Sequence, residues 1–169
     1  MNNTEKTTWQ SIFHYTILSI IMLFSVTLQS AAGGGITLFG FSLLPAVAFV
    51  VGVSVNYGPL TGGIFGLVVG LLLDAYTVPS VGFHLVIMPF LGIACALAAN
   101  HLLLSNRYAR FVLCFVSSLL YTTAYFVVLQ WMLGGHDFSY FYRFTLPGTL
   151  VCTLTCLLYG VGLRWFRRW

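Results

Sequence analysis

Asp74 is the residue best placed to do chemistry in this chain, because it is the only acid in a long apolar body. The 67 residues before it, from residue 7 to residue 73, contain no charged side chain. An acid inside a membrane is costly and usually has a reason to be there. Two interpretations stay open. Asp74 makes a polar contact within a site or with a partner, or it lies near a helix end, where it caps a loop or pairs with His84.

Other reactive residue types form no recognisable constellation. No cysteine pair has a histidine or an acid at metal-ligand spacing, so we expect neither a metal nor a cofactor. No nucleophile stands beside a base and an orienting acid, and residues 58–63 lack the Lys and Ser/Thr of a phosphate loop. We therefore expect no catalytic residues. We expect the cysteines to serve as small packing residues. The residues concerned are His14, His84, His101, His136, Cys95, Cys114, Cys152 and Cys156.

The composition predicts an integral membrane protein. Only 6% of the 169 residues are charged and 59% are hydrophobic, whereas about a quarter of the residues of a soluble domain are charged. The net charge of +4 does not indicate a nucleic-acid partner, because the basic residues lie at the ends of apolar segments. At such positions they set the orientation in a lipid bilayer.

Six apolar segments predict an all-α, polytopic single domain with six transmembrane helices. Each segment is long enough to cross a hydrocarbon core of about 30 Å, and continuous apolar runs favour helices over a β-barrel. Pro59 suits a helix start, while Pro45 and Pro89 should kink the spans that contain them. A small-x-small sequence at residues 30–32 also permits signal-peptide cleavage. The predicted spans are 11–31, 36–55, 60–76, 83–104, 111–133 and 145–165.

A row of glycines marks the third segment. Gly58, Gly62, Gly66 and Gly70 recur every four residues, and Asp74 continues the register. In lipid, small residues at this spacing let two helices approach closely. Either the row packs against the chain's own helices, or it is a groove for a helix of another protein.

Basic residues predict the orientation. If successive segments alternate in direction, Lys6 and five arginines lie on one side of the membrane and Arg143 lies alone on the other. The side richer in Lys and Arg is normally cytoplasmic, which places both termini in the cytoplasm. The five arginines are Arg107, Arg110, Arg164, Arg167 and Arg168.

The hairpin of the third and fourth segments carries a resemblance to a known family. A glycine-rich helix ends in a Gly-Leu-Leu-Leu-Asp run at residues 70–74, and Gly82-Phe83-His84 follows after a short loop. Residues 57–92 are similar to the signature region of the MreD family of rod shape-determining membrane proteins. The loop differs, since residues 78–81 read Val-Pro-Ser-Val where the family more often has glycines.

The resemblance implies a non-enzymatic scaffold subunit of the bacterial cell-elongation complex, which supports cell shape and peptidoglycan synthesis from the inner membrane. Members of this family act with the bitopic protein MreC, with the actin-like MreB, and with RodA and its penicillin-binding protein. On this reading the glycine groove holds the single span of an MreC-like partner, and Asp74, Gly82 and His84 form a polar signature.

The family fold is related to the S-components of vitamin transporters, which provides an alternative function. An S-component predicts an outward-facing pocket, for which Asp74, His84 and Gln130 are the available polar groups. Asn56 falls on the opposite side of the membrane. An S-component docks its transport subunit with a small-x-x-x-small motif on the first helix, and the first segment here has no Ala-x-x-x-Ala.

Overall fold

The computed structural model describes residues 3–33, 44–76, 82–101, 107–133 and 146–166, and these are almost entirely helical. The helices are α1 (Asn3–Gly33), α2 (Pro45–Tyr57), α3 (Pro59–Tyr76), α4 (Phe83–His101), α5 (Arg107–Leu133) and α7 (Leu146–Phe166). The predicted all-α class is confirmed. Within the described residues, four helices contain stretches long and apolar enough to cross a membrane: α1, α3, α4 and α5. The chain is thus a membrane-embedded helical protein, and six complete spans stay a prediction.

The outer surface of the helices is apolar, as lipid requires. On α3 the exposed side chains recur every three or four residues, at Leu60, Ile64, Leu67 and Leu71. This spacing puts them on one helix face. Helix α7 exposes leucines in the same way. A contiguous apolar exterior of this kind marks contact with lipid or with other membrane helices. The exposed large hydrophobic residues described on α4 and α7 are Val86, Phe90, Ile93, Leu97, Leu150, Leu154 and Leu158.

Helix α2 departs from the predicted second span. The helix has 13 residues, so it is about 20 Å long at 1.5 Å per residue, too short to cross the hydrocarbon core alone. Pro45 is its first residue, which makes the predicted kink wrong. Proline is favoured there because its missing N–H has no helical partner and its φ is already helical. Residues 36–43 of the predicted span lie outside the described residues.

The interior position of α2 explains how so short a helix can be held. Every residue from Pro45 to Ser54 is buried. Helices α1, α3, α4, α5 and α7 all pack against α2. Its first turn receives a cap from outside, since the Ala46 N–H donates to Gln29 Oε1 of α1 at 3.1 Å. The core of the molecule is therefore built around α2.

The other helices agree with the prediction more closely. Helix α3 differs from the expected span by one residue and starts at Pro59 as expected; α4 starts at the expected Phe83 and contains Pro89. Helices α1 and α5 begin earlier than expected, at Asn3 and Arg107. The predicted turn residues at 77–80 and 134–137 lie outside the described residues.

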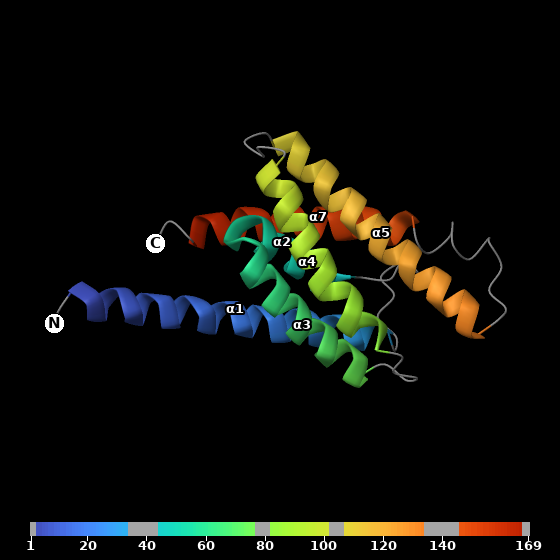
Figure 1. Cartoon of the computed structure of the whole chain (residues 1–169), viewed down its shortest axis with the longest axis horizontal. Coiled ribbons are helices and arrows are strands. Elements are labelled where there is room, and N and C mark those ends of the chain that lie inside the picture. The colour runs from blue at the N-terminus through green and yellow to red at the C-terminus, as the bar shows by residue number, and fades with distance from the viewer. Residues whose placement is uncertain (1–2, 34–43, 77–81, 102–106, 134–145, 167–169) are drawn as a thin grey trace.

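Figure 1 shows the directions of the helices. Helices α1, α3 and α5 run one way along the long axis of the molecule, and α4 and α7 run the opposite way. The beginning of α1 and the end of α7 therefore lie toward the same end (Figure 1). This alternation is the arrangement that the count of basic residues assumed. Which end faces the cytoplasm stays a prediction.

Candidate functional site

The candidate site lies where α3 ends and α4 begins. Asp74 is in the last turn of α3, and Gly82 directly precedes α4 with a φ of 69°. A positive φ is strained for residues with a side chain, so glycine is favoured at position 82. The three residues of the polar signature are thus brought together by the hairpin.

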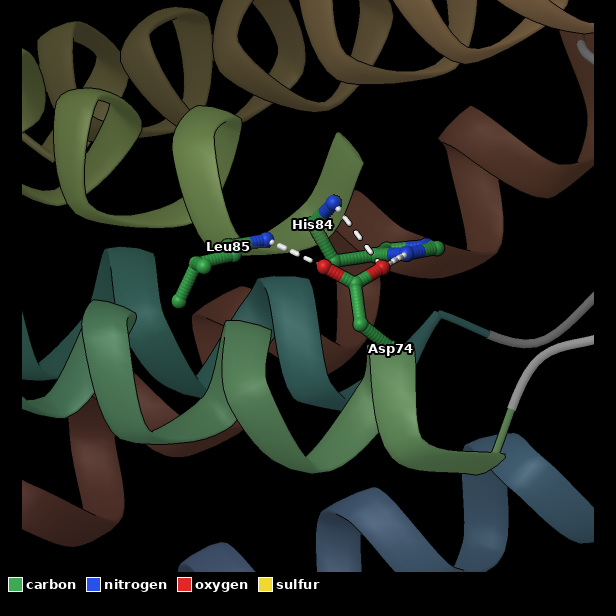
Figure 2. Close-up of polar contacts among 3 residues, drawn as sticks. All are labelled: Asp74, His84 and Leu85. Carbon is green, nitrogen blue, oxygen red and sulfur yellow. Dashed lines mark hydrogen bonds and ion pairs between the residues drawn. The ribbon is translucent and has the colours of Figure 1, made fainter. Parts of the chain in front are cut away.

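The Asp74 carboxylate is bound by α4 on both of its oxygens (Figure 2). Its Oδ1 accepts hydrogen bonds from the His84 backbone N–H at 3.2 Å and from His84 Nδ1 at 2.8 Å. Its Oδ2 accepts the Leu85 N–H at 2.8 Å. Asp74 is only 9% exposed and His84 only 5%. We call this group of Asp74, His84 and the Leu85 N–H the Asp74 clasp.

The clasp is a helix cap supplied by a different helix. The first N–H groups of a helix have no partner within it, and the helix dipole favours negative charge at that end. Asp74 satisfies two of these N–H groups in the first turn of α4 and holds the His84 imidazole as well. The geometry therefore matches the interpretation in which Asp74 pairs with His84, and the group that Asp74 caps is the next helix, not a loop.

Aromatic rings surround the His84 side of the clasp. The His84 ring centroid lies 5.4 Å from that of Phe83, 6.2 Å from Tyr121 and 5.6 Å from Tyr125. The two tyrosines come from α5 and stack with an interplanar angle of 6°. Sequence reasoning missed both. Their four-residue spacing, which puts them on one face of α5, was the available signal.

The glycine row packs against the chain's own helices. A Cβ on Gly66 would lie 2.6 Å from Met88 O of α4. A Cβ on Gly70 would lie 2.8 Å from the carbonyl carbon of His84, and one on Gly62 would lie 2.8 Å from Ser54 Cβ of α2. No real Cβ tolerates such distances. The geometry therefore matches the interpretation in which the row packs against the chain's own helices, α4 and α2.

The glycines that pack α3 against its neighbours differ from the predicted row at two positions, Gly58 and Gly92. Gly58 does not belong to the groove, since it lies between α2 and α3 with a φ of 95° and nothing within 4 Å of an added Cβ. Gly92 of α4 was missed by the sequence reasoning. A Cβ there would lie 2.5 Å from Gly62 O. The close approach of α3 and α4 thus uses glycines from both helices.

The histidines are separated from one another in the fold. His14 Nε2 of α1 hydrogen-bonds the Tyr57 hydroxyl at the end of α2, at 2.5 Å. His101 is exposed at the end of α4, and His136 lies outside the described residues. Among the residues that the structure describes, no three His, Cys, Asp or Glu side chains are grouped so as to hold a metal ion.

The basic residues that the sequence analysis placed on the cytoplasmic side lie in the terminal turns of helices, where they are described. Arg107 and Arg110 are in the first turn of α5, and Arg164 is in the last turn of α7. Arg167 and Arg168 lie outside the described residues. The arginines of α5 and α7 thus occupy terminal turns, as the orientation argument supposed.

No family model, curated protein or solved structure matches this chain. The resemblance to the MreD family therefore rests on the hairpin residues 57–92, together with the length and the predicted six-span plan of the chain.

Proposed function

We propose that this chain is a non-enzymatic scaffold subunit of the MreD kind, which holds an MreC-like bitopic partner in the bacterial inner membrane and so supports rod shape and peptidoglycan synthesis. The observation that carries the proposal is the Asp74 clasp. Both oxygens of the one acid in the apolar body accept hydrogen bonds from α4 and so fasten α4 to α3. A signature used in this way builds a rigid hairpin.

A rigid hairpin suits a scaffold because its helices stay packed on each other. A partner protein then binds the outward face of the hairpin. The inward face of α3 is occupied by α4 and α2, through Gly62, Gly66 and Gly70. Its outward face carries Ile64 and Leu67, which are 57% and 45% exposed. The partner's helix is therefore expected on an outward face of the bundle, and the predicted glycine groove is not its binding site.

Helix α1 is the preferred surface for this partner. It contains a 19-residue apolar stretch, Ile12–Ser30, of which 22% is buried. One narrow face, with Leu18, Met22 and Val26, enters the core. The remaining circumference exposes apolar side chains that include Phe24, which is 65% exposed. A helix held along one stripe leaves most of its surface open to a second transmembrane helix.

The test is co-purification of the tagged chain with the MreC-like protein of the same organism from solubilised membranes. We expect capture by the wild type, and loss of capture when Ile20 and Phe24 are replaced by Ala. The matched control replaces Leu67 and Leu71 of α3, which are similarly exposed. Both variants should keep the melting temperature of the wild type. Failure of the wild type to capture the partner would reject the scaffold proposal, whereas equal loss in both variants would reject the assignment to α1.

The vitamin-binding alternative stays a prediction. The polar groups considered for its pocket are engaged within the chain: Asp74 and His84 with each other, and Asn56 with Gly52 O at 2.8 Å. Gln130 has no described side chain. We therefore advance the scaffold function alone.

A further inference from the structure

Basic residues gather at one end of the helix bundle. The described part of the chain contains four Lys and Arg residues: Lys6 near the start of α1, Arg107 and Arg110 in the first turn of α5, and Arg164 in the last turn of α7. Figure 1 shows that the start of α1, the start of α5 and the end of α7 lie toward the same end of the molecule. The described basic charge is therefore concentrated at this one end, which we call the basic end.

Acidic residues do little to neutralise the basic end. The chain has three acids. Asp74 lies in the last turn of α3, toward the far end of the molecule (Figure 1), and is engaged in the clasp, while Asp137 is outside the described residues. Among the residues that the structure describes, Glu5 of α1 is the one acid toward the basic end. The described residues there carry a surplus of positive charge, which favours an anionic ligand.

The surface of α5 next to its arginines is apolar and exposed. Phe111 and Val112 begin the second turn of the helix and are 40% and 57% exposed. Val116 and Leu120 follow at four-residue spacing, at 45% and 60%, which places them on one face of α5 with Val112. Arg107 and Phe111 are also four residues apart and share a face. The first turn of α5 is thus the border between a lipid-facing apolar surface and a basic helix end.

We propose that the basic end binds an anionic phospholipid at the start of α5. Its phosphate is held by Arg107 and Arg110, since guanidinium N–H groups match phosphate oxygens in geometry and charge. Its acyl chains lie along the exposed apolar face that begins at Val112. Arg164 adds positive charge at the same end of the bundle. A free phosphate would use only the arginines and a neutral lipid only the apolar face, so the two surfaces together select an anionic lipid. This inference is independent of the scaffold function.

The experiment uses the full chain in a neutral detergent and native mass spectrometry. Phosphatidylglycerol and phosphatidylcholine with the same acyl chains are titrated separately, and each Kd is obtained from the bound and free populations. We expect the wild type to bind phosphatidylglycerol more tightly than phosphatidylcholine. Arg107→Gln and Arg110→Gln should each weaken phosphatidylglycerol binding about fivefold, which corresponds to the contribution of one basic residue near an anionic membrane surface. Binding of phosphatidylcholine should stay unchanged.

Two controls distinguish a lipid site from the general attraction of a basic chain. Arg143→Gln is the matched variant, because it removes the same charge from a residue that the sequence places on the opposite side of the membrane. It should leave the affinity for both lipids unchanged. Inorganic phosphate at the concentration of the lipid should not displace phosphatidylglycerol, because it has no acyl chains to bind the apolar face.

The salt dependence of the wild type serves where a variant does not fold. Added NaCl should weaken the binding of phosphatidylglycerol and spare that of phosphatidylcholine, because salt screens the charge interaction alone. Four results would each overturn the inference: equal affinity of the wild type for the two lipids, equal weakening by Arg143→Gln, displacement by inorganic phosphate, or phosphatidylglycerol binding that does not respond to salt.

Discussion

Replacing Asp74 by Ala should be among the most destabilising single changes in the α3–α4 hairpin. The substitution removes the acceptor of three hydrogen bonds, from the His84 N–H, the His84 imidazole and the Leu85 N–H. The site is buried, so little solvent is available to replace the carboxylate. Helix α4 would begin with an uncapped first turn.

The magnitude follows from the number of donors left without a partner. A buried donor that loses its acceptor costs about 1–3 kcal/mol. Three such donors, partly relieved by local rearrangement, predict a loss of about 3–6 kcal/mol in the free energy of unfolding. Asp74→Asn keeps one acceptor oxygen but points an NH2 group at a donor, so about half of that loss is expected. His84→Ala removes one side-chain donor, and about 1–2 kcal/mol should follow.

The assay is equilibrium unfolding in mixed micelles, followed by far-UV circular dichroism. Leu71→Ala serves as the control, because Leu71 is on the same helix and 50% exposed. Its effect should stay within about 0.5 kcal/mol, as for an ordinary surface substitution. Stability of Asp74→Ala within that same margin, or equal to that of Asp74→Asn, would show that the clasp does not hold the hairpin.

Three further predictions are checked by unfolding free energy, by melting temperature and by hydrogen exchange. Gly66→Ala should cost at least about 2 kcal/mol, because the new Cβ meets the Met88 backbone oxygen, which cannot rotate away. Gly63→Ala should cost less than about 1 kcal/mol, since it meets the movable end of Ile93 at 3.1 Å; equal effects would refute the packing argument. Tyr159→Phe should cost about 1 kcal/mol, because it removes a 2.7 Å hydrogen bond to Ser25 of α1 and leaves the ring against Phe49; an unchanged melting temperature would count against this contact. Gln29→Leu should free the Ala46 N–H and speed hydrogen exchange at the start of α2, and unchanged protection there would show that another group caps α2.

The sequence predicted α3 and α4 well because strong local signals bound them. Pro59 fixes one helix start, and the apolar run ends at the polar turn after Asp74. The pairing of Asp74 with His84 was open to prediction for the same reason, since the two residues flank one short loop. The capping of α4 was less predictable. It depends on the orientation of the first N–H groups of α4, which composition does not encode.

The start of α2 could not be predicted from local patterns. An apolar run reads alike whether it faces lipid or lies inside a bundle, so residues 36–55 resembled an ordinary span. Tyr121 and Tyr125 lie far from His84 in the sequence, and they reach the clasp because α5 packs against α4.

On α3, the size of the side chains distinguishes much of the inward face from the outward face. In lipid, a leucine gains little from burial because the surrounding tails are as apolar as the core, so close backbone approach decides which face turns inward. Helix α3 follows this rule: Gly62, Gly66 and Gly70 are buried, while Leu67 and Leu71 face outward. Helix α2, whose buried residues are mostly valine and alanine, lies at the centre. For a membrane chain of this composition, the period of small residues therefore carries the packing information that hydropathy carries in a soluble protein, and the glycine row of α3 was the clearest sign of which face meets α4.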